Sequence, residues 1–478
     1  MSFVKKYLVS KLNKLNISDK DSISVKINHE NCYDPANNKF WCKGCAPSCI
    51  IEGWTSGNDV IDNFIKDTIY NAGKSKKKGH FPLFLEWVPF DRFEDMKQIG
   101  EGGFAKVYSA TWIDGRARYT KQEDWCWMND PNPIKVALKR LNGSQNMSAD
   151  YLNELKTHWN LYKLDRTTLK FYGMTKDPKT EEFMMIIQFA DKGNLRSILS
   201  GNFNNISWND KIRYLCDSAG DLKNLHSLGS FHKDFHSGNI LSNGINSYIS
   251  DFGLSGPINK QKSDNKLYGV LPYIAPEVLN GEPYTISSDI YSFGVVMAEL
   301  SSGKPPFHNR KHDISLALRV CNGLRPEFGK GTPEIYKKLA HRCMNANPDQ
   351  RPTVNELCEI FFCWYLYKDN EICGYRRNEV KAIFEEANKE IPNILASYVK
   401  DPGAIYTSRV FTFKNLSKPI NSSFITTLYL NEEENKGITF VIKVISRKAV
   451  DVIDHHGGAM MIMRSKLSRF SINWLRGS

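Results

Sequence analysis

The sequence lacks any apolar run long enough to cross a membrane. A spanning helix requires roughly 18 or more predominantly apolar residues, and the longest apolar run, around Ile360–Tyr367, is far shorter. The N-terminal stretch has lysines among its apolar residues, so it lacks the apolar core of a secretory signal. The 11 cysteines show no regular disulfide framework. We therefore expect the chain to work in a reducing compartment, the cytoplasm or, as the alternative, the nucleus.

The central part of the sequence lacks a charge bias. Apolar residues (41%) and charged residues (24%) have ordinary globular values, which excludes a wholly disordered, collagenous or coiled-coil chain. The net charge of +12 lies mainly in the flanks: residues 1–80 have 13 basic and 8 acidic side chains (+5), and residues 366–478 have 17 and 12 (+5). Residues 81–365, with 34 and 32, reach only +2. The lysine runs of the flanks lack interleaved aromatic residues, so nucleic acid is not an expected partner.

Hydrophobic periodicity predicts a strand-rich region followed by a helix-rich one. Apolar runs predict strands at 107–112, 134–141, 169–175 and 183–189. Apolar residues at helical spacing predict helices at 207–228, 287–301, 333–345 and 352–366. Further helices are expected within 54–70, where Gly57 and Asn58 precede the helix, and at 376–399. Strands followed by helices indicate an α+β fold with a small β-rich lobe and a larger helical lobe.

The strand-rich region contains residues suited to nucleotide phosphates. Ile99–Val107 places glycines in a turn between two strands, where backbone amides can approach phosphate oxygens, although the same pattern also fits an ordinary hairpin. Lys139 follows on an apolar strand and can hold phosphates if a carboxylate fixes its position. Glu154 lies 15 residues later, in a helix that Ser148 can cap.

The helix-rich region contains carboxylates suited to a metal ion and a proton. Asp234 and Asn239 lie five residues apart within H-K-D-F-H-S-G-N, and Asp251 begins a D-F-G triplet twelve residues after Asn239. An aspartate at position 234 can accept a hydroxyl proton. The oxygens of an asparagine and a second aspartate suit Mg²⁺.

In this order the motifs resemble those of eukaryotic protein kinases: glycine loop, strand lysine, helix glutamate, H-x-D-x-x-x-x-N, D-F-G and A-P-E. Asp289 resembles the residue that braces the catalytic loop, and Arg351 resembles the buried arginine that pairs with Glu277. F-H-S-G-N and G-V-L-P-Y-I-A-P-E are similar to the tyrosine-kinase-like group, including its expanded fungal members. The resemblance covers about residues 82–368.

The resemblance implies a bilobal kinase fold, ATP and Mg²⁺ as cofactors, and protein substrates in intracellular signalling. It implies that Asp234 orients and deprotonates the acceptor hydroxyl and that Lys139 and Asn239 assist catalysis. Asn239 and Asp251 would hold Mg²⁺, and Ile187 would stand at the entrance to the adenine site. The implied nucleotide-binding residues are Ile99, Gly100, Glu101, Gly102, Gly103, Val107, Ala137, Lys139, Glu154, Gln188, Ala190, Leu241 and Asp251.

Three residues depart from the usual kinase pattern. His236 stands where serine/threonine kinases have a phosphate-touching lysine, Lys233 replaces an arginine, and Val270 replaces a threonine that helps to distinguish the two acceptor classes. We expect serine or threonine as the acceptor, with tyrosine as the alternative. The complete set of motifs favours an active enzyme over a pseudokinase scaffold or interaction protein.

A group of cysteines precedes this region. His29 and Cys32, followed by Cys42 and Cys45, have the paired spacing of a tetrahedral zinc site, with four reduced cysteines and no metal as the alternative. We therefore expect an N-terminal segment (1–28), a zinc knuckle with a helix (29–72), a basic linker (73–81), the kinase domain (82–368), a C-terminal helix (369–399) and a largely disordered tail (400–478). The sequence indicates neither the physiological substrate nor the oligomeric state.

Overall fold

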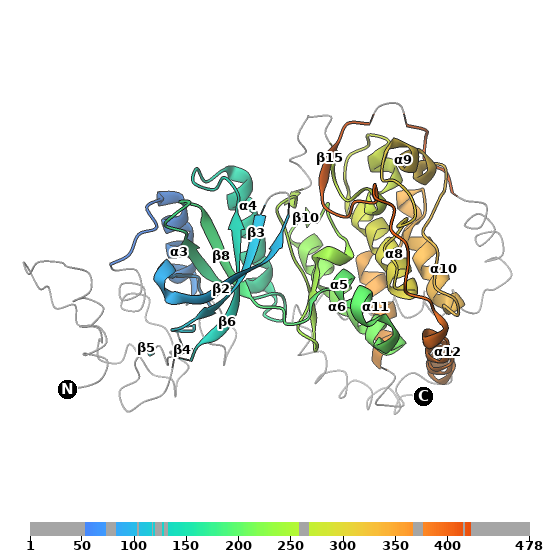
Figure 1. The fold of residues 1–478 in the computed structure, drawn as a ribbon, viewed down its shortest axis with the longest axis horizontal. Coiled ribbons are helices and arrows are strands. Elements are labelled where there is room, and N and C mark those ends of the chain that lie inside the picture. The colour runs from blue at the N-terminus through green and yellow to red at the C-terminus, as the bar shows by residue number, and fades with distance from the viewer. Residues whose placement is uncertain are drawn as a thin grey trace, which may run out of the picture. The chain divides into compact units, whose positions relative to one another are not determined.

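The computed structural model describes residues 53–72, 83–102, 105–116, 118–119, 127–128, 132–257, 267–366, 376–413 and 416–421. They form two compact units, and Figure 1 shows that one is rich in strands and the other in helices. The N-terminal unit has two segments, the described residues up to Leu152 and Lys170–Phe189. The C-terminal unit comprises Asn153–Leu169 and the described residues from Ala190 onward. Helix α4 (Ala149–Leu164) contributes residues to both.

A six-stranded sheet, in the order β1-β7-β8-β6-β3-β2, is the framework of the N-terminal unit. The neighbouring pairs are antiparallel except for β1 with β7. A separate pair, β4 and β5, lies within the long connection before β6. The strands are β1 (Glu86–Trp87), β2 (Phe93–Glu101), β3 (Ala105–Trp112), β4 (Arg118–Tyr119), β5 (Trp127–Met128), β6 (Ile134–Leu141), β7 (Phe171–Lys176) and β8 (Phe183–Gln188), with a short 3₁₀ turn, η2, at Phe90–Arg92.

Side chains of β6 alternate between the two faces of this sheet, because successive residues of a strand point to opposite sides. Val136 and Leu138 are fully buried and pack with Trp112 in an apolar cluster. Ala137 and Lys139 therefore lie on the opposite face. The sheet thus separates an apolar core from the face that holds the predicted nucleotide-binding lysine.

Helix α3 (Asp59–Ala72) also belongs to the N-terminal unit and starts at a side-chain cap. Asn58 Oδ1 accepts two backbone N–H groups of the first turn, at 3.0 and 3.3 Å. The helix therefore begins directly after Gly57 and Asn58, as the sequence predicts, because the cap holds the preceding residues in a turn. The Leu85 N–H donates to Thr68 Oγ1 at 2.9 Å, which joins the helix to the chain before β1.

The C-terminal unit is built around α8 (Ile286–Ser302), which is buried along nearly its whole length. A large apolar core surrounds it, and a small sheet, in the order β12-β11-β9, supports the functional loops described below. The other helices are α5 (Leu195–Asn202), α6 (Trp208–Ser227), α7 (Pro276–Leu279), α9 (Ile314–Cys321), α10 (Glu334–Cys343), α11 (Val354–Tyr365) and α12 (Arg376–Glu390). The strands are β9 (Gly193–Asn194), β10 (Ser230–Phe231), β11 (Ile240–Ser242), β12 (Ser247–Ile249), β13 (Gly256–Pro257), β14 (Leu267–Gly269) and β15 (Arg409–Phe411). The 3₁₀ turns are η3 (Phe203–Asn205), η4 (Ser237–Asn239), η5 (Leu271–Tyr273), η6 (Pro348–Gln350) and η8 (Ile391–Asn393).

The structure confirms the α+β class, with an antiparallel sheet followed by a helical unit. The predicted strands and the four central helices appear within a few residues of their expected bounds. The predicted helix 376–399 is shorter, because α12 ends at Glu390 and a turn containing Pro392 follows it. Within the described ranges no helix is long and apolar enough to cross a bilayer.

Part of the C-terminal tail differs from the expected disorder. Residues 400–413 and 416–421 have a defined course on the C-terminal unit, and β15 pairs with β14 in antiparallel register. The predicted zinc ligands His29, Cys32, Cys42 and Cys45 lie outside the described residues.

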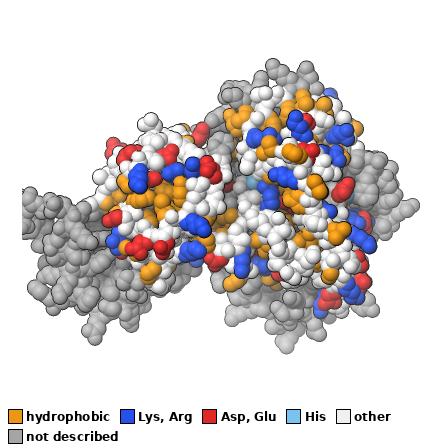
Figure 2. Space-filling model, viewed as in Figure 1, with side chains coloured by type: hydrophobic (Ala, Val, Ile, Leu, Met, Phe, Trp, Pro, Cys, Tyr) orange, Lys and Arg blue, Asp and Glu red, His pale blue; other side chains and the backbone are white. Residues whose placement is uncertain are grey.

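The described surface does not present a large basic patch on the face drawn in Figure 2. There, Lys and Arg side chains are interspersed with acidic, apolar and neutral ones. This distribution agrees with the near-neutral charge of residues 81–365.

Candidate active site

The glycine loop lies between β2 and β3, as the sequence predicts. The Gly102 N–H donates to the carbonyl oxygen of Ala105 at 2.8 Å, which closes the turn. Glu101 is exposed, and its side chain accepts from Gln98 at 2.9 Å and lies 3.3 Å from Lys106 Nζ. The described loop residues among the predicted nucleotide-binding set are Ile99, Gly100, Glu101 and Gly102, and Gly103 lies outside the described residues.

Four predicted residues share one face of the N-terminal sheet. Val107 is directly opposite Lys139 in the β3–β6 register, and Ile187 is opposite Ala137 in the β6–β8 register. Directly opposed residues point to the same side of a sheet, so all four lie on the face away from the Trp112 cluster. Gln188 ends β8 on the opposite side of that strand, and its backbone N–H donates to the carbonyl oxygen of Lys170 at 3.0 Å.

Lys139 is buried, with only 8% of its surface exposed, although lysines rarely lie inside proteins without a functional or structural reason. Its strand neighbours Leu138 and Arg140 behave differently: Leu138 is in the core, and Arg140 forms an ion pair with Asp177 at 3.3 Å. Glu154 belongs to the other unit, so its pairing with Lys139 stays a prediction.

The C-terminal unit holds the predicted catalytic loop through one buried carboxylate. Asp289, at the start of α8, accepts the backbone N–H groups of His232 and Lys233 at 2.8 and 3.1 Å. It also contacts His226 Nε2 at 2.9 Å. Lys233 adopts a left-handed backbone conformation (φ 67°), which turns the chain just before Asp234. The bracing role that the sequence suggests for Asp289 therefore has a direct hydrogen-bonded basis.

His232 links this loop to the D-F-G segment. Its Nδ1 accepts the Asp234 N–H at 3.3 Å, and its Nε2 lies 3.1 Å from the Ser250 carbonyl oxygen. Burial lowers the pKa of His232, although the nearby carboxylates Asp289 and Asp234 oppose this effect. A neutral imidazole accepts at one nitrogen and donates at the other, so the ring suits both contacts.

Asp234 is a buried carboxylate kept in its ionised form. Burial by itself raises its pKa, but the adjacent His236 imidazole and hydrogen bonds from His236 and Ser408 outweigh burial, so the net pKa is below the usual aspartate value. His236 Nε2 lies 3.6 Å from Asp234 Oδ2. Asp234 Oδ1 is buried and has no hydrogen-bond partner among the described residues. An ionised oxygen of this kind can accept a proton.

His236 occupies the place of the usual lysine and has its own fixed geometry. Its Nδ1 accepts the Gly238 N–H at 3.0 Å, which leaves Nε2 to face Asp234. The ring can therefore orient this carboxylate from the position where kinases usually have a lysine.

Asn239 and Asp251 present oxygen atoms suited to Mg²⁺. Asn239 Nδ2 donates to the Asp234 carbonyl oxygen at 3.0 Å, which fixes the amide and leaves its oxygen available to a ligand. The Ser250 N–H donates to the Asn239 carbonyl oxygen at 2.8 Å, so the residue before Asp251 is held to the same loop. Asp251 has a left-handed backbone (φ 65°). Oxygen donors of this kind fit the hard cation that the kinase motifs imply.

Glu154 and Leu241 lie near these loops. A Cβ atom placed on Gly253 would be 3.2 Å from Glu154 Oε2, so this carboxylate lies beside the D-F-G glycine. Leu241 is half-buried on β11 and pairs with Asn194 of β9. Ala190 begins the second segment of the C-terminal unit, and its carbonyl oxygen accepts the Gly193 N–H at 3.0 Å.

Sequence reasoning missed a polar network behind the catalytic loop. Glu299 on α8 accepts the hydroxyl groups of Ser237 and Tyr273 at 2.8 and 2.6 Å. Arg196 donates to Tyr273 Oη at 3.2 Å and lies 3.5 Å from His236 Nδ1. A glutamate within the buried, otherwise apolar run Phe293–Leu300 of α8 was the available signal, because such a residue requires a partner.

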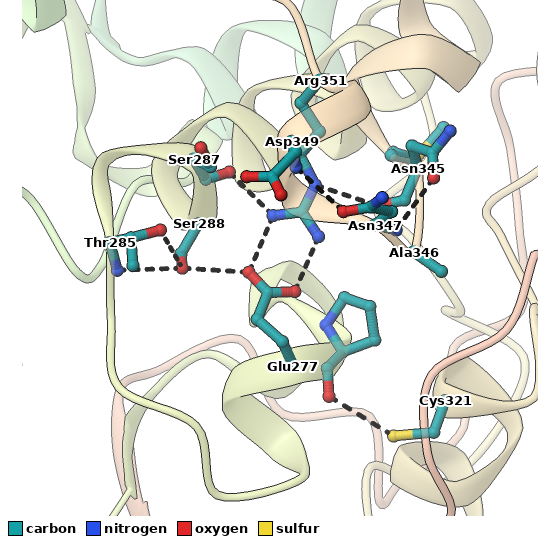
Figure 3. A network of polar contacts seen from close by, with 12 residues as sticks. Glu277, Thr285, Ser287, Ser288, Cys321, Asn345, Ala346, Asn347, Asp349 and Arg351 are labelled. Atoms are coloured by element: carbon teal, nitrogen blue, oxygen red, sulfur yellow. Dashed lines mark hydrogen bonds and ion pairs between the residues drawn. The ribbon is translucent and has the colours of Figure 1, made fainter.

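The pair predicted between Glu277 and Arg351 is present and buried. Arg351 Nη1 and Nη2 donate to Glu277 Oε1 and Oε2 at 2.7 and 2.6 Å. Figure 3 shows the same guanidinium reaching the Ser287 carbonyl oxygen, while Ser288 donates to Glu277. This bidentate pair joins the A-P-E segment to the start of α8 and to the loop before α11.

Comparison with known proteins identifies the family. Residues 93–361, more than half of the chain, match the protein tyrosine and serine/threonine kinase family, and the chain belongs to it.

Two relatives are probable serine/threonine-protein kinases of Dictyostelium discoideum. One is 30% identical over 272 residues (55% of this chain, 15% of that protein), and the other is 34% identical over 237 residues (48% and 22%). A leaf rust 10 disease-resistance locus receptor-like protein kinase-like protein of Arabidopsis thaliana is 29% identical over 289 residues (55% and 39%). The matches therefore span well under half of each of these relatives.

Proposed function

We propose that this chain is an active protein kinase that transfers the γ-phosphate of Mg²⁺–ATP to serine or threonine hydroxyl groups of proteins. The observation that carries the proposal is the ionised, buried carboxylate of Asp234 on a loop that Asp289 braces through two backbone hydrogen bonds. The serine/threonine names of the relatives support the acceptor class. The motifs quoted above support membership of the tyrosine-kinase-like group.

Phosphoryl transfer requires mainly positioning and charge neutralisation from the protein. Asp234 would orient the acceptor hydroxyl and take its proton. Asn239 and Asp251 would hold Mg²⁺, which supplies positive charge against the phosphate oxygens. Lys139 would bind the α- and β-phosphates, and Val107, Ala137 and Leu241 would contact the adenine. A scaffold without catalysis is the alternative, and the complete set of kinase motifs favours the active enzyme.

Lys139→Met is expected to weaken nucleotide binding and to slow phosphate transfer by about 10²–10³-fold, because it removes a charge directed at the phosphates. Lys135 provides a matched control, since it is exposed on the same face of β6, four residues earlier. Lys135→Met should change neither property. Both variants can be compared with wild type by nucleotide titration and by transfer of labelled phosphate to a generic protein substrate.

Phosphoamino-acid analysis of the products tests the acceptor class in the same experiment. We expect phosphoserine and phosphothreonine. Phosphotyrosine as the main product would overturn the serine/threonine assignment. Nucleotide binding without any transfer by the wild-type chain would instead identify a scaffold.

We also propose that His29, Cys32, Cys42 and Cys45 bind one Zn²⁺, on the strength of their spacing. Within the described part of the chain, no group of three or more histidine, cysteine or acidic residues could hold a metal ion. Elemental analysis of the purified full chain should find about one zinc ion per molecule. Cys42→Ser combined with Cys45→Ser should remove the zinc, whereas Cys363→Ser, on α11, should retain it. A wild-type chain without zinc would refute this site.

A further inference from the structure

Residues 403–411, which we call the docked segment, lie in an extended course across the C-terminal unit. The His312 N–H donates to the Gly403 carbonyl oxygen at 3.0 Å, and the Tyr406 hydroxyl donates to the Pro306 carbonyl oxygen at 2.9 Å. Arg196 Nη1 donates to the Tyr406 carbonyl oxygen at 3.1 Å. Backbone and side-chain contacts from three parts of the unit therefore hold this segment in place.

The end of the docked segment adds a strand to the region between the D-F-G and A-P-E motifs. Leu267, Tyr268 and Gly269 of β14 pair with Phe411, Val410 and Arg409 of β15 in antiparallel register. Phe411 is 8% exposed and belongs to the main apolar core, whereas Val410 is 49% exposed. Strand addition of this kind is a common way for a protein to bind an extended peptide, with alternate side chains anchored in pockets.

This arrangement places a hydroxyl group at the proposed catalytic base. Ser408 Oγ donates a hydrogen bond to Asp234 Oδ2, and this bond contributes to the lowered pKa of Asp234. Thr407, the adjacent hydroxyl residue, is exposed. Gly269 of β14 lies close to the same carboxylate, since a Cβ atom on it would be 3.4 Å from Asp234 Oδ1. The docked segment thus holds one of its three hydroxyl groups, that of Ser408, where the base can act on it.

We propose that the chain's own catalytic centre phosphorylates Ser408 in cis. Until Ser408 is phosphorylated, the docked segment occupies the place of a substrate peptide. This inference rests on the proposed kinase activity. Ser408 Oγ attacks the γ-phosphorus of ATP, the bond from that phosphorus to the β–γ bridging oxygen breaks, and ADP leaves with the electron pair. The hydroxyl proton passes to Asp234. The product is a phosphoserine monoester.

Phosphorylation also removes the contact that holds Ser408 in place. A phosphoserine carries a charge of about −1.5 to −2 near neutral pH and has no hydroxyl proton to donate to Asp234. Asp251 adds a second carboxylate close enough to influence Asp234. Repulsion between like charges therefore favours release of the docked segment, which frees β14 and Asp234 for another polypeptide.

Phosphatase-treated full-length chain, incubated with Mg²⁺–ATP and analysed by mass spectrometry over time, tests the proposal. We expect Ser408 to be phosphorylated first, at a rate per molecule that is unchanged over a hundredfold range of protein concentration. Peptide phosphorylation should start with a lag that ends as Ser408 is modified. Ser408→Ala should keep the initial slow rate of peptide phosphorylation throughout. The neighbouring control Thr407→Ala should behave like wild type.

A matched pair on β15 tests the docking itself. Phe411→Ala removes the buried anchor and should slow Ser408 phosphorylation at least tenfold while abolishing the lag with a peptide substrate. Val410→Ala, on the exposed side of the same strand, should change neither the rate of Ser408 phosphorylation nor the lag with the peptide substrate. Thermal unfolding of both variants, monitored by circular dichroism, shows whether the C-terminal unit remains folded. If Phe411→Ala unfolds it, Arg409→Ala, which removes the hydrogen bond to the His312 carbonyl oxygen, provides the same comparison.

The outcomes distinguish this inference from the proposed function. Transfer to a generic protein substrate without modification of Ser408 would overturn the inference alone. A Ser408 rate that rises in proportion to protein concentration would overturn modification in cis. Absence of transfer to every acceptor, including Ser408, would overturn the proposed kinase activity as well.

Discussion

Asp234→Asn is expected to slow phosphate transfer by about 10²–10⁴-fold while leaving nucleotide affinity unchanged. Asparagine has nearly the same shape as aspartate, so the backbone bonds of Asp234 to His232 and Asn239 should persist. It cannot accept the proton of an incoming hydroxyl. A 10³-fold loss corresponds to about 4 kcal/mol of transition-state stabilisation. The measurement is single-turnover transfer from Mg²⁺–ATP, together with a separate nucleotide titration.

Asp95→Asn is the matched control for this change. Asp95 is exposed on β2 and has a left-handed backbone (φ 52°), a conformation that asparagine tolerates well. This variant should transfer phosphate at the wild-type rate. Equal transfer by wild type and Asp234→Asn would exclude Asp234 as the base. A parallel loss of nucleotide affinity would indicate a structural defect rather than a catalytic one.

Arg351→Ala is expected to reduce the free energy of unfolding by about 3–5 kcal/mol, because it leaves the buried carboxylate of Glu277 without its bidentate partner. The Arg351 side chain is 0% exposed and that of Glu277 only 10%. Arg351 also donates to the Ser287 and Asn345 carbonyl oxygens at 2.8 and 2.9 Å, and both acceptors would lose a partner. Urea denaturation followed by tryptophan fluorescence measures the change.

Arg342 offers a matched ion pair near the surface of the same unit. It donates to Glu356 at 2.8 Å, but the two side chains are 33% and 24% exposed. Pairs exposed to solvent contribute about 0–1 kcal/mol, so Arg342→Ala should lower stability far less than Arg351→Ala. Equal losses in the two variants would contradict the role assigned to burial. Arg351→Lys should recover only part of the stability, because lysine cannot form the two-pronged contact.

Four strands of the N-terminal unit and the four central helices of the C-terminal unit could be predicted from the sequence to within a few residues. Apolar periodicity is a local signal, and α6, α8 and β6 each contain enough of it to define their own type. The bounds of a helix were less predictable where a proline acts. Pro392 follows the early end of α12, whereas Gly57 and Asn58 mark the start of α3 in the sequence.

Structural contacts were predictable where the kinase motifs specify them: Arg351 pairs with Glu277, and Asp289 accepts two backbone N–H groups of the catalytic loop. The catalytic role of Asp234 and the metal-binding role of Asn239 stay predictions. Glu299 in an apolar run signals that it needs a partner, but its partners Arg196 and Tyr273 were not predictable, because the members of this network are up to about a hundred residues apart. Their partnership follows only from the packing of α5, η5 and α8.

By itself, the sequence determined the fold class, the order of the catalytic motifs and the near-neutral charge of the central region, because each depends on residue type and spacing along the chain. Only the tertiary structure decided that residues from the C-terminal tail lie on the C-terminal unit. Ser408 and Asp234 are 174 residues apart, and no local pattern links them. The link comes from strand pairing between β14 and β15 and from the burial of Phe411, which are non-local interactions.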